Sequence, residues 1–336
     1  MVGVRRVSVS EVLGDAEQRY LGGGFRGVQQ RLHRIAVQGA AGGGATVRAA
    51  LSVTYPEGWS AKSGQASRLP HLSTVDALLA AVQLAEVMLL DVLHLPPAAR
   101  PWVWLRRVVI RAGTSAVNDL EDIQIRGELA DVRQHENPLL SSSALFTMRF
   151  TVGALRVELE LVALQAQACS LTRTHHDVEE VLGGRADRYF GEGFKSDQIV
   201  IGDGLLIDEF TIRVPVSKTS HQEFVDIGSS YASIPTFVNC VLGQAQISQL
   251  LLYSLDDMDR SMSENLWMRQ VEMVSQGPQC HPESDFDSTV RVARTRLLPL
   301  GERPWRVTDF VGRFGPISSR YNLAHALPAS KGTGNP

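Results

Sequence analysis

The sequence predicts an α+β protein made of two tandem repeats, each with one long apolar helix wrapped by an antiparallel sheet. Three blocks of similar sequence occur in the same order in the two halves of the chain. Each half also carries one long apolar helical pattern among many alternating patterns, which are typical of strands. A helix that is apolar nearly all round must be covered on most sides, and a curled antiparallel sheet covers it most economically.

The repeat is clearest near the start of each half. Residues 11–25 read EVLGDAEQRYLGGGF and residues 180–194 read EVLGGRADRYFGEGF, with nine of fifteen positions identical at an offset of 169. Residues 73–92 resemble residues 236–255 at an offset of 163, and the same offset then aligns VWLR with LWMR. Chance similarity between two amphipathic helices could explain the middle block alone. Three blocks in one order therefore indicate a duplication.

This duplication divides the chain into two units. We expect a first hot-dog repeat at residues 1–165, a connection at 166–178, a second hot-dog repeat at 179–326 and a disordered tail at 327–336. The resulting fold is a double hot-dog. A general pair of α+β domains is the alternative.

The long helices are expected at residues 73–93 and 236–255. Ser73 and Thr236 are suitable N-cap residues, because their hydroxyl groups can accept a hydrogen bond from the first turn. A proline shortly before each helix suits an entry turn.

Shorter elements surround these helices. Each repeat is expected to open with a short helix, at residues 9–20 and 178–189, followed by a glycine-rich turn. Alternating patterns predict strands at residues 34–38, 46–55, 103–112, 122–129, 145–150, 154–163, 205–216, 267–274 and 289–297.

Composition excludes several classes of function. Hydrophobic residues make up 44% of the chain, and 33 basic against 36 acidic residues give a net charge of −3. This balance favours neither nucleic acid nor an acidic membrane surface as a partner. The three cysteines show no zinc or disulfide spacing, and the N-terminus lacks a signal-peptide pattern. We therefore expect a cytoplasmic protein with no membrane span, no metal site and no cofactor.

Polar residues within the apolar helices are the first candidates for a site. The first helix carries Asp76, Gln83 and Glu86, and the second carries Asn239, Gln246 and Gln249 at the same three positions, together with Gln244. Burial of such groups without partners costs about 1–3 kcal/mol each. They are expected either to form a network between the halves or to line a substrate pocket.

A catalytic pair is expected at the start of the first helix. His71 precedes the N-cap, where free N–H groups and a partial positive charge could stabilise a carbonyl oxygen or an enolate. A neutral His71 could act as a general base, oriented by Asp76. The second half has no histidine there, and Asn239 replaces the aspartate, so one active and one degenerate site are expected. Alone, His71 could equally be a surface or capping residue.

Two arginines follow a tryptophan in strand patterns of both halves. Arg106 and Arg269 could each pair with an internal carboxylate or bind a substrate anion. For an internal pair, Asp76 and Glu86 are the expected carboxylates.

Several stretches carry a resemblance to a known family. They are LGDAEQRYLGGGFRGVQQ, YPEGWSAKS, LPHLSTVDALLAAVQLAE, IPTFVNCVLGQAQISQLLLY and DDMDRSMSENLWMR, of which PHLSTVD and LWMR are the most specific. Over residues 8–320 the chain resembles the avirulence D protein family of plant-pathogenic bacteria. That family is associated with syringolides, which are acylated, sugar-derived lactones. It is also similar to the A-factor type butyrolactone synthases, which are double hot-dog proteins.

The resemblance implies an enzyme of secondary metabolism that condenses a β-ketoacyl thioester with a small hydroxyketone or sugar. A hydroxyl group would attack the thioester, and an aldol-type closure would follow. A hot-dog dehydratase, isomerase or cyclase on a polyketide-like intermediate is the alternative, because such an enzyme needs only one acid–base pair. A third possibility is a non-catalytic receptor for a hydrophobic signal.

The expected partners follow from the first of these functions. They are a small-molecule substrate and the acyl carrier protein or CoA that delivers it as a thioester. A homodimer is one assembly to consider for the protein itself. His71 and Asp76 are the expected catalytic residues. The expected substrate-binding residues are Gln83, Glu86, Arg106, Asn239, Gln246, Gln249 and Arg269.

Overall fold

The computed structural model describes most of the chain. The described residues are 5–40, 43–59, 69–137, 140–166, 168–220, 222–231, 234–258, 260, 266–275, 277, 285–300 and 303–327. The predicted tail at 327–336 lies outside this part of the chain, apart from Leu327.

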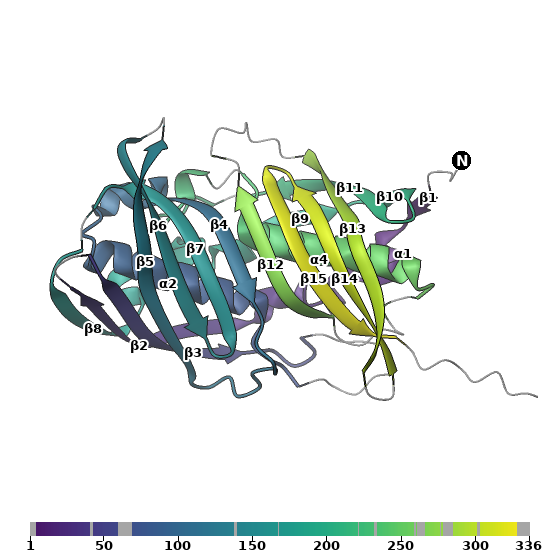
Figure 1. The fold of residues 1–336 in the computed structure, drawn as a ribbon, viewed down its shortest axis with the longest axis horizontal. Coiled ribbons are helices and arrows are strands. Elements are labelled where there is room, and N and C mark those ends of the chain that lie inside the picture. Colours follow the sequence, from purple (N-terminus) through teal and green to yellow (C-terminus); the bar gives the residue numbers. More distant parts are fainter. Residues whose placement is uncertain are drawn as a thin grey trace, which may run out of the picture.

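One long antiparallel sheet forms the frame of the molecule (Figure 1). The strand order is β1-β10-β11-β13-β14-β15-β12-β4-β7-β6-β5-β3-β2-β8, and β9 pairs with β11 beside this path. The strands are β1 (Arg5–Val7), β2 (Gln29–Gly39), β3 (Ala45–Thr54), β4 (Trp104–Arg111), β5 (Ile123–Asn137), β6 (Leu140–Val152), β7 (Leu155–Leu164), β8 (Leu171–Asp177), β9 (Gln198–Ile201), β10 (Gly204–Asp208), β11 (Thr211–Thr219), β12 (Trp267–Ser275), β13 (Asp285–Leu300), β14 (Arg303–Phe314) and β15 (Ile317–Ala326).

Two long helices lie against the concave side of this sheet. They are α2 (Thr74–Asp91) and α4 (Phe237–Leu255), and two short ones are α1 (Val9–Leu13) and α3 (Glu179–Leu182). Six 3-10 turns complete the elements: η1 (Ala16–Gln18), η2 (Gly24–Gly27), η3 (Pro97–Trp102), η4 (Arg185–Asp187), η5 (Gly193–Lys195) and η6 (Ser229–Tyr231). The α+β class, with a large antiparallel sheet and few helices, is thus confirmed.

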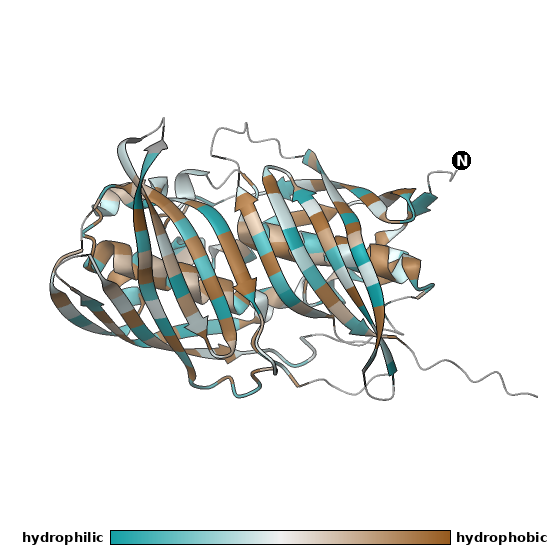
Figure 2. Ribbon diagram, viewed as in Figure 1, coloured by the Kyte–Doolittle hydropathy of each residue, from teal (hydrophilic) through white to brown (hydrophobic). Residues whose placement is uncertain are grey.

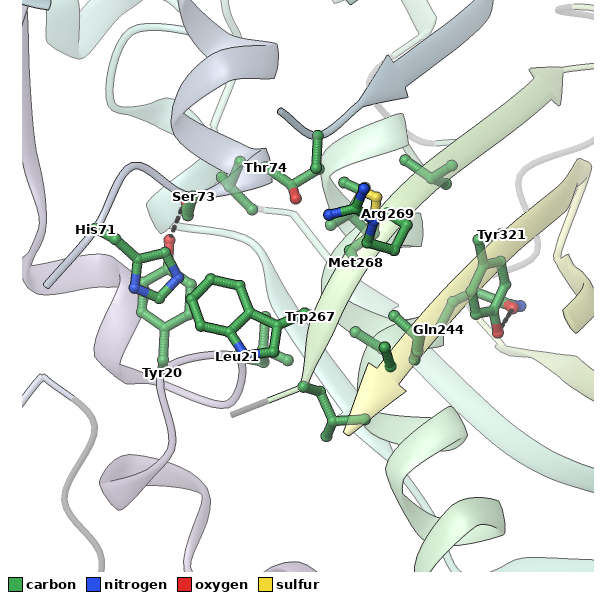
Figure 3. A pocket seen from close by; sticks show the side chains of 18 of the residues that line it. Tyr20, Leu21, His71, Ser73, Thr74, Gln244, Trp267, Met268, Arg269 and Tyr321 are labelled. Carbon is green, nitrogen blue, oxygen red and sulfur yellow. Dashed lines mark hydrogen bonds between the residues drawn. The ribbon is translucent and has the colours of Figure 1, made fainter. Parts of the chain in front are cut away.

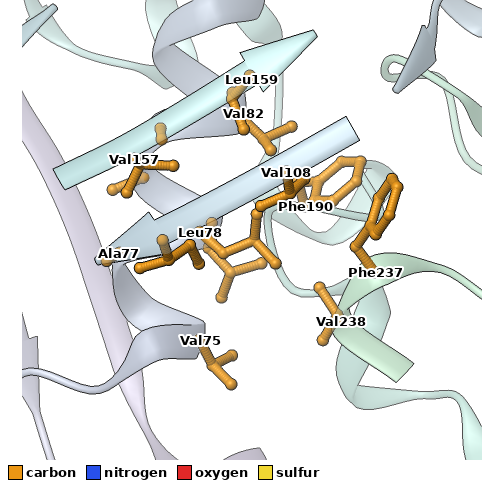
Figure 4. Packing of buried hydrophobic residues seen from close by; sticks show 14 of the residues in the cluster. Val75, Ala77, Leu78, Val82, Val108, Val157, Leu159, Phe190, Phe237 and Val238 are labelled. Atoms are coloured by element: carbon orange, nitrogen blue, oxygen red, sulfur yellow. The ribbon is translucent and has the colours of Figure 1, made fainter. Parts of the chain in front are cut away.

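Both long helices are buried, as their apolar patterns predict. In α2, every residue except Thr74 and Leu90 is buried. The helix packs on β2, β3, β6 and β7, while α4 packs on β9, β11, β13 and β14. The apolar contacts run on from one half to the other where the helix N-termini approach each other, around Val75, Phe237 and Val238 (Figure 4). None of the described helices is long and apolar enough to cross a membrane.

In the middle of the long sheet, the two halves meet at the strands β4 and β12. Strand β4 pairs with β12 in antiparallel register, from Arg107 opposite Val274 to Arg111 opposite Gln270. Elsewhere in the sheet apolar and polar residues alternate, for example along β7, and Figure 2 shows such alternation as bands of brown and teal. The Arg107 guanidinium reinforces the junction, because it bonds Glu272 of the second half at 2.7 Å and Glu158 of the first at 2.9 Å.

The short opening helices end earlier than predicted. We expected them to run to residues 20 and 189, but α1 ends at Leu13 and α3 at Leu182. The cause is a glycine in the left-handed region after each helix, Gly14 with φ 73° and Gly183 with φ 87°. Such a residue ends a helix, because the chain turns away from the helical path.

Segment placement also differs from a simple division into two halves. The predicted connection at 166–178 contains β8, which pairs with β2 and extends the first half of the sheet. Strand β1 pairs with β10 of the second half. The N-terminal segment therefore begins beside the second repeat and only then enters the first.

Candidate active site

A cavity of about 850 Å³ lies between the two halves. Its walls come from the start of α2, the segment after β4, the middle of α4 and the strands β12, β14 and β15. The lining residues include Tyr20, Leu21, His71, Ser73, Thr74, Gln244, Trp267, Met268, Arg269 and Tyr321, which are labelled in Figure 3. Apolar side chains such as Val271, Met273, Val307 and Leu323 line the wall formed by β12, β14 and β15.

His71 lies in the cavity wall just before α2. Its imidazole packs on Trp267 of the second half, with ring centroids 5.2 Å apart, and on Trp59 at 6.1 Å. Burial lowers the pKa of His71, although the Asp76 charge and the Leu69 backbone act in the opposite direction. His71 is therefore neutral at pH 7, the form that can accept a proton.

The first turn of α2 faces the same cavity. Thr74 and Val75 line it. Among the described residues, no hydrogen-bond acceptor is found for the backbone N–H groups of these two residues. Helix geometry explains this, because the first N–H groups of a helix have no intrahelical partner. They can stabilise negative charge on a carbonyl oxygen close to His71.

Asp76 serves the helix rather than the cavity surface. It forms a capping box with Ser73, in which the carboxylate accepts from the Ser73 N–H at 3.0 Å and the Asp76 N–H donates to the Ser73 hydroxyl. Gln30 and Tyr55 also donate to the carboxylate. No hydrogen bond to His71 is found among the described contacts of Asp76. The expected His71–Asp76 pair therefore interacts through charge alone, and its catalytic role stays a prediction.

The second helix has a matching cap in which the negative charge has a different source. Asn239 forms the capping box with Thr236, and its amide donates to the buried Asp197 at 3.0 Å. Tyr189 donates to the same carboxylate at 2.9 Å, and the Lys218 ammonium lies 3.8 Å from it. The loss of the aspartate at position 239 thus does not remove the charge from this region, contrary to what the sequence suggested.

Gln83 and Glu86 are buried away from the 850 Å³ cavity, among charges of the second half. Arg188 donates to Gln83 at 2.7 Å, and Glu86 accepts from Arg100 at 2.7 Å and from the Ile227 N–H at 3.2 Å. Burial, together with nearby Asp226, raises the pKa of Glu86 to about 7. These two residues are part of a network between the halves, which was the other role considered for them.

The corresponding residues of α4 do line the cavity. Gln246 donates to the Leu21 carbonyl at 2.9 Å, while Gln249 makes no hydrogen bond within the described part of the chain. Gln244 is a polar helix residue outside the expected set of site residues. It also lines the cavity, where it accepts from Tyr321 at 3.1 Å and donates to Ser288 at 3.1 Å.

The two arginines after tryptophan have different surroundings. Arg106 pairs with Glu160 at 2.5 Å, so the expectation of Asp76 or Glu86 as its partner is wrong. A bulge in β4 explains this, because the register shifts between Leu105 and Arg107, and the guanidinium groups of Arg106 and Arg107 both reach Glu160 on the neighbouring strand β7. Arg269 lines the cavity and donates to the Gly113 carbonyl at 3.2 Å.

A much smaller cavity of about 70 Å³ marks the equivalent place in the other half. It is lined by Trp104, Tyr189, Pro235 and Thr236, and Ile234 stands where the first half has His71. Among the described residues, no cluster of three or more His, Cys, Asp or Glu side chains could hold a metal ion.

Comparison with solved structures gives weak overall likenesses. A putative oleoyl thioesterase of Lactobacillus plantarum is 11% identical, with a TM-score of 0.34 and coverage of 90% of this chain and 97% of that one. A conserved protein of Mycobacterium tuberculosis, described as having a double hotdog fold, is 10% identical, with a TM-score of 0.36 and coverage of 79% and 84%. GphF dehydratase 1 is 10% identical, with a TM-score of 0.34 and coverage of 88% and 98%.

Sequence comparison identifies the family. No curated protein sequence matches the chain. One family model, described as Pseudomonas avirulence D protein (AvrD), matches residues 5–328. Because the match spans nearly all of the sequence, it confirms the resemblance seen in the PHLSTVD and LWMR stretches, and the chain belongs to the AvrD family.

Proposed function

We propose that this AvrD family protein is a double hot-dog enzyme that joins a β-ketoacyl thioester to a small hydroxyketone or sugar without a cofactor. The supporting observation is the position of His71. A neutral imidazole lies beside free helix N–H groups in a cavity large enough for a small-molecule substrate. The cavity combines an apolar wall, suited to an acyl chain, with amide side chains suited to a polyol.

The first step is an acyl transfer. Neutral His71 accepts the proton of the attacking hydroxyl group as its oxygen bonds to the thioester carbonyl carbon. The N–H groups of Thr74 and Val75 stabilise the oxyanion that forms. The carbon–sulfur bond then breaks, and the thiolate takes the proton from His71 and leaves as CoA or carrier-protein thiol.

The second step closes a ring. The carbon between the two carbonyl groups of the acyl unit is acidic, and His71 removes one of its protons. The resulting carbanion bonds to the ketone carbon of the acceptor, whose oxygen takes up the proton. Gln244, Gln246 and Gln249 would hold the hydroxyl groups during this aldol addition, in line with their position in the cavity wall.

Incubation of the purified protein with a β-ketoacyl thioester and xylulose tests the proposal. We expect thiol release that depends on xylulose, together with a product mass equal to the two substrates minus the thiol. His71→Ala should reduce the rate at least a hundredfold, since general base catalysis contributes roughly 10²–10⁴. Thiol release that is absent, or equal in the two proteins, would contradict it.

The same experiment separates the other candidate functions. Loss of one water, or no mass change, without thiol release would identify a dehydratase, isomerase or cyclase. Tight binding of the thioester with no turnover would identify a receptor.

A further inference from the structure

Arg19 and Arg188 occupy equivalent positions in the sequence repeat and in the fold. The N–H of Gly22 donates to the Arg19 carbonyl at 3.1 Å, and that of Gly191 donates to the Arg188 carbonyl at 3.2 Å. Each guanidinium also donates through Nε to a nearby carbonyl, that of Asp15 or that of Gly183. The two arginines can therefore be compared with each other, one beside the large cavity and the other in the half where the equivalent cavity is much smaller.

Each arginine is followed by a tyrosine that bonds the helix cap of its own half. Tyr20 bonds Ser73 at 2.8 Å, and Tyr189 bonds Thr236 at 2.6 Å. The arginine itself lies toward the long helix of the other half. Arg188 reaches Gln83 on α2, whereas Arg19 lines the cavity together with the α4 residues.

Around Arg188, the protein itself supplies partners for the guanidinium. Nη1 of Arg188 donates to Gln83, and the carboxylates of Glu86 and Asp226 supply the opposite charge. A buried guanidinium requires such compensation, because an unpaired buried charge costs several kcal/mol. At the offset of 163 residues, the position of Glu86 corresponds to Gln249. The carboxylate of one half is therefore an uncharged amide in the other.

Arg19 has no equivalent compensation. Its side chain is buried, with the residue only 7% exposed, and Nη1 has no hydrogen-bond partner. Arg260 lies at the same end of the cavity, where it donates to the Gln18 carbonyl at 3.2 Å. Burial and the Arg260 charge lower the pKa of Arg19, and the Asp15 charge, which acts in the opposite direction, does not offset them. The described lining contains Arg19, Arg260 and Arg269 but neither aspartate nor glutamate.

We propose that Arg19 binds an oxyanion of the substrate, a phosphate ester or a carboxylate, which supplies the counter-charge that Glu86 supplies to Arg188. This inference rests on the proposed function, in that it assigns the charged group to the hydroxyl-bearing substrate. Arg260 strengthens the same site by its charge. A bidentate guanidinium contact suits the planar carboxylate and the phosphate equally well.

Calorimetric titration without any thioester tests this assignment. The probes are xylulose, xylulose 5-phosphate and a pentonate, at constant ionic strength. We expect one of the two anions to bind at least tenfold more tightly than xylulose, and the tighter one identifies the oxyanion. Equal affinity for all three would overturn the proposal. Since no thiol is released in this experiment, its failure and the failure of the condensing activity remain distinguishable.

Two variants locate the site. Arg19→Gln should remove the preference for the anion. Gln249→Glu places a carboxylate where Arg188 has Glu86, so it should also weaken anion binding at least tenfold. Arg106→Gln, which removes a positive charge on the outer face of the sheet, is the control and should bind as wild type does. A wild-type anion preference in both cavity variants would refute the role of Arg19.

Discussion

His71 and Asp76 show how residues close in sequence can have different surroundings. The imidazole lies in the cavity wall against Trp267, whereas the carboxylate is enclosed by Ser73, Tyr55 and Gln30 at the helix cap. Burial is therefore the largest influence on the histidine, and its pKa falls below the ordinary value of 6.5. The carboxylate acts on it only as a nearby negative charge.

The pH dependence of activity should reflect this burial. Because the pKa of His71 is lowered, the imidazole stays neutral to more acidic pH than an exposed histidine would. We expect the acidic limb of kcat/KM for thiol release to be centred below pH 6.5. A rate profile from pH 4.5 to 8 measures the acidic limb. A limb centred above pH 6.5 would show that another group controls the reaction.

Substitution of Asp76 should move that limb in a defined direction. Asp76→Asn removes the negative charge that favours protonated His71, so the acidic limb should shift to still lower pH. The amide can keep the cap, as Asn239 does on α4. Asp76→Ala should instead destabilise the fold, by about 0.5–2 kcal/mol for the cap and about 1–3 kcal/mol for each donor left without an acceptor. An unchanged limb in the asparagine variant would mean that the two groups are not coupled.

The stability of helix α2 depends on a buried charge. The helix carries Glu86 into a region that also contains Asp226 and Arg188, where burial raises the carboxyl pKa to about 7. The fold thus favours protonated Glu86. Its contribution to stability is complete below the unfolded pKa of 4.5 and is lost as the pH rises through 7.

Glu86→Gln should abolish this loss. The amide does not ionise, so the melting temperature of the variant relative to wild type should increase between pH 5 and pH 8. Thermal unfolding of both proteins at the two pH values measures the difference, in which the titrating groups that do not interact with Glu86 cancel. A difference that is constant or decreases with pH would contradict the assigned pKa.

At the scale of the whole molecule, the two halves are joined at more places than the β4–β12 strand pair. Phe25 and Phe194, from equivalent positions in the repeat, stack with ring centroids 6.0 Å apart. Arg26 donates to the carbonyls of Lys195 and Asp197, both at 2.9 Å. Hence we expect the protein to unfold as one cooperative unit.

A double-mutant cycle at the phenylalanine pair tests this expectation. Phe25→Ala and Phe194→Ala should each cost about 3–5 kcal/mol, with a coupling of about 0.5–1.5 kcal/mol between them. The pair Phe286 and Phe314 lies within the second half and serves as a comparison. Two separate unfolding transitions, or no coupling across the halves, would show that the repeats are independent.

The duplication, the two long helices, their caps and the antiparallel sheet could all be predicted from the order of residues alone. Periodicity and cap chemistry are local properties, so Ser73, Thr236 and the buried faces could be read directly from the chain. The sequence also singled out His71, Gln246 and Gln249, which the cavity brings together.

Which half each segment contacts could be seen only in the folded protein. The same positions face the open cavity in α4 and a buried charge cluster in α2, and Arg106 and Asp76 have partners far away in sequence. Gln244 and Arg19 line the cavity for this reason as well. Long-range packing selects such partners, and neither propensity nor spacing along the chain encodes it.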